Sequence, residues 1–154
     1  MNVLIFGAGS IGNHLANASR SLGWNVTICD LDLAALERTK TQIYPQRYGA
    51  WDQSINLVHN DDRPTSNDIV IIGTPPKYHL PLANEVVSES PQAILIEKPV
   101  SGINLEGADE LLSKAVDNNV SLFVGYDHAL SESVTKSSSL LLSEDGLGEI
   151  QTLD

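Results

Sequence analysis

Residues 1–12 read MNVLIFGAGSIG, and the fold predicted for the whole chain is built outward from this stretch. Val3–Phe6 is a continuous apolar run with β-branched members, which is typical of a strand buried on both faces of a parallel sheet. Apolar side chains then recur at helical spacing, at Ile11, Leu15, Ala18 and Leu22. Between the two lies a turn with the spacing G-x-G-x-x-G, so the stretch predicts a strand, a tight turn and a helix in direct succession.

Each glycine of this turn has its own physical role. Gly7 permits the tight turn out of the strand, Gly9 lets a pyrophosphate approach the backbone, and Gly12 lets the helix pack closely on the strand. The N-terminus of the helix offers free N–H groups and a partial positive charge to phosphates. We therefore expect the turn to bind a dinucleotide cofactor through Gly7, Gly9, Ser10, Ile11 and Gly12.

An acidic residue stands where such a cofactor needs one. The second predicted strand, Asn25–Cys29, is followed by Asp30, eighteen residues after Gly12. A carboxylate at this position can bond both hydroxyls of an adenosine ribose. A carboxylate also repels a 2′-phosphate, and Arg38 falls two turns into the next helix, so the sequence favours NAD over NADP. The alternative is an ordinary glycine turn beside a solvated Asp30.

The composition excludes several classes of partner. The chain has 154 residues, 42% of them hydrophobic, which is enough for one domain with a core. A net charge of −11 and a pI near 4.5 disfavour nucleic acid and anionic membranes as partners. A single cysteine favours a reducing compartment, no apolar run approaches a membrane span, and no Cys/His cluster has metal-ligand spacing. Since a strand beginning at residue 2 leaves no room for a signal peptide, we expect a soluble cytoplasmic protein without a metal site.

The rest of the chain alternates predicted strands with predicted helices. Beyond Asp30 the expected strands are 68–72, 93–96 and 120–124, with a weaker one near 47–50. The expected helices are 33–43, 54–59, 77–88, 105–117 and 134–142. The helix at 105–117 is expected to turn Leu111, Leu112, Ala115 and Val116 inward. This alternation predicts an α/β protein with a doubly wound parallel sheet, the Rossmann fold.

In such a sheet, ligands bind outside the carboxyl ends of the strands. The residues predicted at those ends are Gly7–Gly12, Asp30, Gly73–Pro76, Glu97–Pro99 and Gly125–His128. They share one edge of the sheet, and we expect the site there.

These edge residues carry a family resemblance. The specific stretches are GTPPKYH at 73–79 with PLA at 81–83, EKP at 97–99, and VGY at 124–126 with GLGEI at 146–150. With them, the chain resembles over essentially its whole length the N-terminal half of the glucose–fructose oxidoreductase / inositol dehydrogenase / MocA family (Gfo/Idh/MocA). In that family Asn is common at the position of Asp127 and a basic residue at that of Ala129, which leaves substrate contacts by Asp127 or His128 open.

The resemblance implies a role for each edge residue. Gly7, Gly9 and Gly12 would hold the pyrophosphate of NAD and Asp30 its adenosine ribose, while Thr74, Pro75, His79 and Glu97 would lie along the cofactor. Lys98 would be the catalytic lysine that hydrogen-bonds the substrate hydroxyl, and the resemblance allows a cis bond before Pro99. The alternatives are a solvated lysine at Lys98 and a plain surface residue at His79.

The resemblance implies that an α+β domain follows in the family's dehydrogenases, and we expect these 154 residues to stop where that domain would begin. We therefore expect a dinucleotide-binding domain over 1–145 and the start of the missing domain over 146–154. The implied function is the NAD-binding part of an oxidoreductase that acts on a CH–OH group of a sugar, cyclitol or related compound. We expect it to be inactive alone and, with apolar surface exposed, able to self-associate as a homo-oligomer. The main alternative is a non-catalytic NAD-binding sensor or interaction module; a methyltransferase is less favoured because Glu97–Pro99 has no role there.

Overall fold

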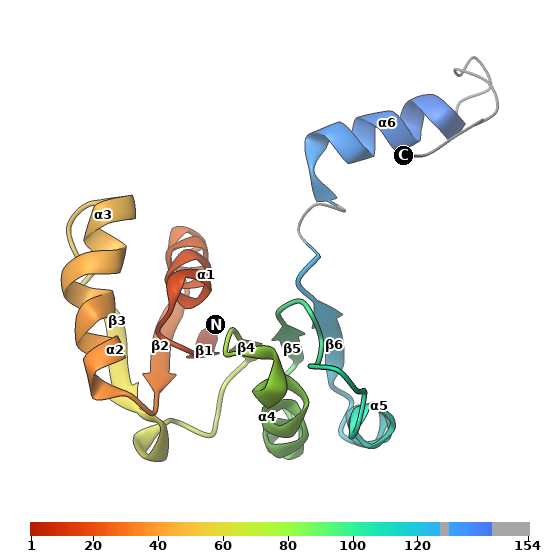
Figure 1. The fold of residues 1–154 in the computed structure, drawn as a ribbon, viewed down its shortest axis with the longest axis horizontal. Helices are drawn as coiled ribbons and strands as arrows, with labels where there is room; N and C mark the ends of the chain where they lie inside the picture. Colours follow the sequence, from red (N-terminus) through yellow and green to blue (C-terminus); the bar gives the residue numbers. More distant parts are fainter. Residues whose placement is uncertain (127–129, 143–154) are drawn as a thin grey trace. The chain divides into compact units, whose positions relative to one another are not determined.

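The computed structural model describes residues 1–126 and 130–142, which divide into two units (Figure 1). The first unit, 1–124, contains one sheet of six parallel strands in the order β3-β2-β1-β4-β5-β6. The strands are β1 (Asn2–Phe6), β2 (Asn25–Asp30), β3 (Ile55–His59), β4 (Ile69–Ile72), β5 (Ala93–Ile96) and β6 (Ser121–Val124). The predicted doubly wound α/β fold is confirmed.

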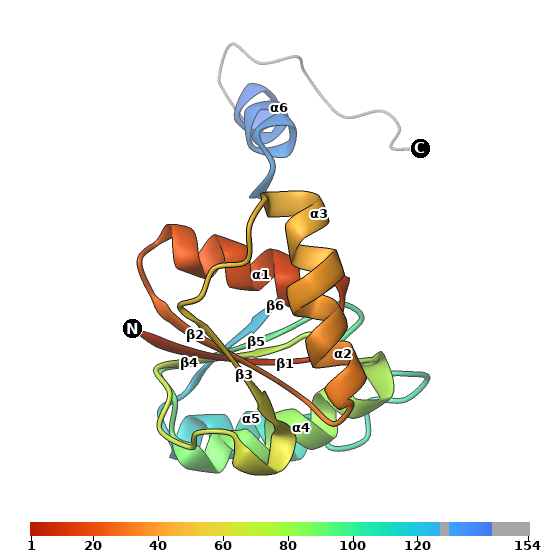
Figure 2. The same cartoon turned by 90° about the vertical axis from the view of Figure 1, so that its left-hand side faces the viewer.

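Helices cover both faces of this sheet (Figure 2). On one face lie α1 (Ser10–Ser21), α2 (Leu33–Arg38), the π-helical segment η1 (Thr39–Ile43) and α3 (Tyr44–Tyr48). On the other lie α4 (His79–Val86) and α5 (Ala108–Asp117). Three short 3₁₀ turns lie between elements: η2 (Asn60–Asp62), η3 (Pro76–Tyr78) and η4 (Val87–Glu89).

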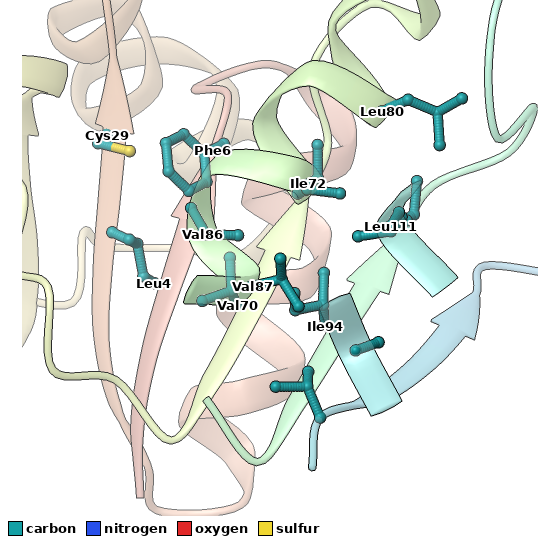
Figure 3. Close-up of a cluster of buried hydrophobic side chains, with 14 residues drawn as sticks. Leu4, Phe6, Cys29, Val70, Ile72, Leu80, Val86, Val87, Ile94 and Leu111 are labelled. Carbon is teal, nitrogen blue, oxygen red and sulfur yellow. The ribbon is translucent and has the colours of Figure 1, made fainter. Parts of the chain in front are cut away.

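Successive side chains of the strands enter two separate cores, as strand geometry requires. Along β1, Leu4 and Phe6 join a cluster with α4 and α5 (Figure 3), whereas Val3 and Ile5 join a second cluster with α1 to α3. All four of these side chains are at most 2% exposed. Burial on both faces is the reason that β1 reads as a continuous apolar run.

Helix α1 forms where expected but buries a different face. Ile11 and Leu22 are 42% and 63% exposed, while the buried residues are small or polar: Gly12, Asn13, Ala16 and Ser19. A Cβ on Gly12 would stand 1.9 Å from the carbonyl oxygen of Gly7. The helix therefore lies too close to the glycine turn for large side chains. Of the predicted apolar stripe, Ile11, Ala18 and Leu22 are exposed, and Leu15 is half-buried against the second core.

The segment between α2 and β4 differs most from expectation. The predicted strand near 47–50 and the predicted helix at 54–59 are both wrong: residues 44–48 form α3 and residues 55–59 form β3, which pairs with β2. The Tyr44 ring is buried and packs edge-on against Tyr48 and Trp51, with ring centroids 5.2 and 5.1 Å away. These aromatic contacts favour the helix, which ends at Gly49 with φ at +87°.

Helix α5 covers its edge of the sheet only in part. It begins at Ala108, later than predicted, and buries Leu111 and Ala115, while Leu112 and Val116 are 57% and 80% exposed. The inward assignment of the latter two is wrong because the buried face of α5 spans a narrower stripe.

The second unit, 125–154, contains the predicted last helix as α6 (Glu132–Leu142). The boundary expected at 145/146, the stretch 146–150, Asp127 and His128 lie outside the described residues. None of the helices in 1–126 and 130–142 is long and apolar enough to cross a membrane.

Candidate functional site

The carboxyl ends of β1, β2 and β4 enclose a cavity of about 470 Å³. Five predicted cofactor residues line it together: Gly7, Gly9, Asp30, Thr74 and Pro75. Ser10, Ile11, Gly12, His79, Glu97 and Lys98 are not part of its lining. Two further hollows, of about 580 and 620 Å³, lie at the amino ends of β1 and β2 and beside α4.

The glycine turn is tight at both ends and open in the middle. Gly7 has φ at +102°, and a Cβ there would stand 2.9 Å from the carbonyl oxygen of Gly73. Gly12 is packed even more closely, against Gly7, whereas a Cβ on Gly9 would meet nothing within 4 Å. Packing thus requires glycine at positions 7 and 12 but not at 9, and the open side of Gly9 faces the cavity.

Two buried polar side chains hold the turn from behind. The Asn13 amide nitrogen donates to the carbonyl of Gly9 at 2.8 Å and to the Thr39 hydroxyl at 3.2 Å, and that hydroxyl donates to the carbonyl of Ala8. Both side chains are fully buried. Sequence reasoning missed this pair, because a polar residue on a helix is ordinarily expected to face water.

The N-terminus of α1 presents backbone donors beside the turn. Gly9 caps the helix without a side-chain hydrogen bond, and no acidic residue occupies its first turn. The first N–H groups of a helix have no partner within it, so they are free to bind an anion such as a phosphate. Ser10 and Ile11 provide such N–H groups, which is how they can serve a cofactor without lining the cavity with their side chains.

The Asp30 carboxylate links β2 to the turn. One oxygen accepts the Ala8 N–H at 2.8 Å, and the other accepts the Asp32 N–H at 2.9 Å. Each oxygen keeps a second lone pair for a hydroxyl group. Arg38 lines the same cavity, so its separation along the sequence does not keep it away from this site.

The loop after β4 contributes the opposite wall. The Thr74 hydroxyl oxygen is buried and has no hydrogen-bond partner within the described part of the chain. Buried polar atoms are nearly always bonded, so an unpaired hydroxyl at a cavity indicates a ligand or water partner. Tyr78, which was not predicted, also lines the cavity and is 46% exposed.

His79 lies behind this wall, and it is 1% exposed. Its Nε2 is 2.6 Å from the carbonyl oxygen of Thr74, and its Nδ1 is 2.9 Å from that of Pro99. The imidazole therefore connects the loop after β4 to the loop after β5. The reading of His79 as a plain surface residue is wrong.

The Glu97–Pro99 loop is held by few contacts. The Lys98–Pro99 peptide bond is cis, as the resemblance allows, and a Glu97 carboxylate oxygen accepts the Lys98 N–H at 3.3 Å. The Lys98 side chain is exposed, and its amine makes no hydrogen bond or ion pair within the described ranges. The Lys98 amine is thus accessible to solvent.

Cys29 stands at the base of the cavity as a neutral thiol. Burial raises the pKa of Cys29 to about 12, and its sulfur lies 3.9 Å from the amide oxygen of Asn60. A protonated thiol is a poor nucleophile, so we assign Cys29 no chemical role. Over the part of the chain that the structure describes, no three His, Cys, Asp or Glu side chains gather as a metal site.

Solved structures share this fold. UDP-N-acetylglucosamine 3-dehydrogenase GnnA from Acidithiobacillus ferrooxidans matches with a TM-score of 0.73 at 18% identity, over 90% of this chain and 41% of that one. The WlbA dehydrogenase from Bordetella pertussis, in complex with NADH and UDP-GlcNAcA, matches with a TM-score of 0.68 at 19% identity, over 90% of this chain and 40% of that one. Biliverdin reductase from Synechocystis sp. PCC 6803, in complex with biliverdin and NADP⁺, matches with a TM-score of 0.66 at 14% identity, over 91% of this chain and 43% of that one. The chain spans about two fifths of the length of these proteins.

The family is established by sequence. No curated protein matches the chain. Residues 1–126 match the model of an oxidoreductase family with an NAD-binding Rossmann fold, GFO_IDH_MocA. The chain therefore belongs to the Gfo/Idh/MocA oxidoreductase family.

Proposed function

We propose that the chain is the NAD-binding domain of a dehydrogenase that moves hydride between a nicotinamide cofactor and a CH–OH group of a sugar, cyclitol or related compound. The observation that carries this proposal is the cavity in which the open Gly9, the Asp30 carboxylate and the unpaired Thr74 hydroxyl meet. Each suits one part of a dinucleotide: the pyrophosphate, the adenosine ribose and the nicotinamide half.

In this proposal the cofactor lies across the carboxyl ends of β1, β2 and β4. Gly7, Gly9 and Gly12 shape the pyrophosphate site, with the N–H groups of Ser10 and Ile11 beside it, and Thr74 and Pro75 form the nicotinamide wall. His79 and Glu97 hold the loops rather than the cofactor itself. Lys98, in the loop that follows β5, the neighbour of β4 in the sheet, hydrogen-bonds the substrate hydroxyl.

Cofactor and substrate class rest on chemistry and likeness together. Asp30 favours a free ribose hydroxyl, so we propose NAD, although one structural neighbour holds NADH and another NADP⁺. The GnnA and WlbA neighbours are named or crystallised with sugar nucleotides, which supports a sugar derivative as substrate.

In this proposal, catalysis needs more of the protein than the residues that line the cavity. Efficient turnover needs a positioned substrate and exclusion of water, and the exposed Lys98 has neither within the described residues. We propose that residues 1–145 form the dinucleotide domain, that 146–154 begin a second domain, and that the chain alone turns over poorly and self-associates. Its buried lone thiol suits the reducing cytoplasm.

The proposal is tested by titrating the chain with NADH in a calorimeter, using two glycine variants. Gly9→Val fills the space where the pyrophosphate would lie, while Gly102→Val fills equally open space in a loop away from the cavity. We expect wild type and Gly102→Val to bind NADH and Gly9→Val to lose binding. Equal binding by both variants, or none by wild type, would overturn the proposal.

A non-catalytic NAD-binding sensor is the second candidate, and the observation that favours it is the absence of Lys98 from the cavity lining. A sensor needs the cavity but not the lysine. When the chain is joined to its second domain, Lys98→Ala abolishes turnover in a dehydrogenase and changes nothing in a sensor. Lys40→Ala, an exposed lysine away from the cavity, is the control.

A further inference from the structure

The strand β6 ends the sheet on the side of α5, and its outer edge has no partner strand in the described part of the chain (Figure 1). Residues 118–126 contain no charged residue and no proline, the features that usually protect an edge strand. The strand at the opposite edge, β3, instead lies between Asp52 and the acidic turn Asn60–Asp62. An open and uncharged edge such as β6 is suited to pair with another strand.

The backbone of β6 shows which groups are available for pairing. The Ser121 N–H donates to the Gln92 carbonyl at 3.1 Å, so it points toward β5. Because successive residues of a strand point their N–H and C=O groups to opposite sides, those of Leu122 and Val124 point toward the open edge. Each of these two residues thus offers one donor and one acceptor to a neighbouring strand.

Apolar side chains flank this edge on both faces of the sheet. On α5, Leu112 and Val116 are one helical turn apart and exposed, and with Leu122 they line a hollow of about 410 Å³ between α5 and β6. Phe123 is 56% exposed and projects from the opposite face of the strand. These side chains and the edge backbone expose on the order of 500 Å² in each copy, so a pair would bury about 1,000 Å², the size at which specific interfaces begin.

We propose that β6 is an interface at which two copies of this chain pair edge to edge and join their sheets into one. Two-fold symmetry makes the two strands antiparallel. With the axis beside Phe123, Leu122 of each copy lies opposite Val124 of the other, and this register bonds every outward N–H and C=O group of the two residues. The two α5 helices then approach each other on one face of the joined sheet, through Leu112 and Val116.

Charge and register favour a second copy over another partner. A cationic protein would find no acidic side chain on β6, although the whole chain carries a net charge of −11. A second β6 strand, in contrast, satisfies all outward groups of the first one. Because two chains of equal charge repel each other, the dimer should become tighter as salt screens that repulsion.

The inference names the surface for the self-association proposed above and rests on that part of the proposed function alone. The cofactor cavity has no residue of β6 or α5 in its lining. Dimerisation and NADH binding are therefore measured separately on the same variants.

Sedimentation equilibrium of the 154-residue chain tests the interface. We expect a monomer–dimer equilibrium with a dissociation constant on the order of 10 µM, as suits a small interface. Val116→Asp puts a carboxylate of each copy into the contact and should raise this constant by about tenfold or more. The control is Leu33→Asp, at an exposed residue of α2 outside the cavity lining, which should change the constant by less than about twofold.

Phe123→Cys tests the register. Residues directly opposite in a non-hydrogen-bonded antiparallel pair have Cα atoms about 4.5 Å apart, within the range of a disulfide. Oxidation with diamide should therefore link this variant into covalent dimers. Cys29 is buried and should not compete, and Leu33→Cys, which is also exposed, should link far more slowly.

Three results would overturn the inference: a monomer at concentrations far above the expected dissociation constant, equal weakening of the dimer by Val116→Asp and Leu33→Asp, or equal cross-linking of the two cysteine variants. Slow amide exchange at Leu122 and Val124 in a monomer would also overturn it, because another part of the same chain would then cover the edge. None of these results bears on the cofactor cavity. Loss of NADH binding in wild type, measured by calorimetry, would instead overturn the cofactor part of the proposed function.

Discussion

Two loops of the same sheet edge are built very differently. The glycine turn after β1 is fixed on several sides: Asp30 binds the Ala8 N–H, Thr39 binds the Ala8 carbonyl, and Asn13 binds the Gly9 carbonyl. Among the side chains that the structure describes, only His79 hydrogen-bonds the Glu97–Pro99 loop from outside it, at the Pro99 carbonyl. The first loop is shaped before any ligand arrives, while the second presents an exposed lysine.

The difference between the two loops suits them to different tasks, cofactor binding for the glycine turn and chemistry for the Glu97–Pro99 loop. A preformed turn binds a dinucleotide without first ordering its own backbone, which lowers the cost of binding. A lysine with free rotamers adds little to catalysis until a substrate is held beside it. We therefore propose that the cofactor half of the site is complete within the described residues and that the chemical half needs further walls.

The largest expected effect comes from Gly12→Val, which would break the more rigid loop. The added Cβ meets a backbone oxygen at 1.9 Å, and neither helix nor strand can move aside without losing core contacts. The free energy of unfolding should fall by about 3 kcal/mol or more, measured by urea denaturation. Gly102→Val, with open space around it, should stay within about 0.5 kcal/mol of wild type. Similar stability in both variants would show that α1 is not closely packed on the turn.

Asn13→Ala should come next, because it leaves the Gly9 carbonyl without its side-chain partner. A loss of about 2 kcal/mol is expected in the same denaturation experiment. Thr39→Val removes the other half of the pair, so the double variant should lose less than the sum of the two single losses. Strict additivity would mean that the two side chains do not act on the turn together.

His79→Gln tests how the second loop is held in place. Gln cannot reach both carbonyls with the geometry of the imidazole, so we expect the free energy of unfolding to fall by about 1.5 kcal/mol. We also expect faster exchange of the Glu97 amide, which donates to the Ile72 carbonyl at 3.0 Å. The control is His14→Gln, an exposed histidine bonded to the Tyr48 hydroxyl, with a smaller expected effect. An unchanged exchange rate at Glu97 would mean that His79 does not hold this loop.

The smallest effect is expected for Lys98→Ala. The exposed amine has no partner within the described ranges, so the free energy of unfolding should stay within about 0.5 kcal/mol of wild type. The NADH dissociation constant should also stay within about twofold, because Lys98 lies outside the cavity lining. A marked loss of stability would contradict the loose structure assigned to this loop, and a marked loss of affinity would place Lys98 on the cofactor.

Short-range patterns were enough to predict most of the sheet. The strands β1, β2, β4, β5 and β6 are apolar runs ended by Gly, Asp or Glu-Lys-Pro, and Gly7, Asp30 and Thr74 follow directly from their positions at strand ends. The prediction for residues 44–59 was wrong because the contacts of Tyr44 with Tyr48 and Trp51, rather than local propensity, determine the secondary structure there.

Other features depend on packing that no local pattern carries. The buried face of α1 follows from its close approach at Gly12, which an apolar count cannot reveal. Asn13 and Thr39 meet across a long stretch of chain, and Arg38 reaches the cavity only because α2 returns along the sheet edge. Such long-range contacts require the structure.

The most direct test of the central claim is an amide NMR titration of the chain with NADH. A preformed cofactor site predicts that shifts on saturation concentrate at Gly7–Gly12, Asp30–Leu31 and Thr74, while the amides of Val100 and of α5 stay in place. Shifts spread over the loop after β5 and away from the glycine turn, or no shifts at any NADH concentration, would contradict it.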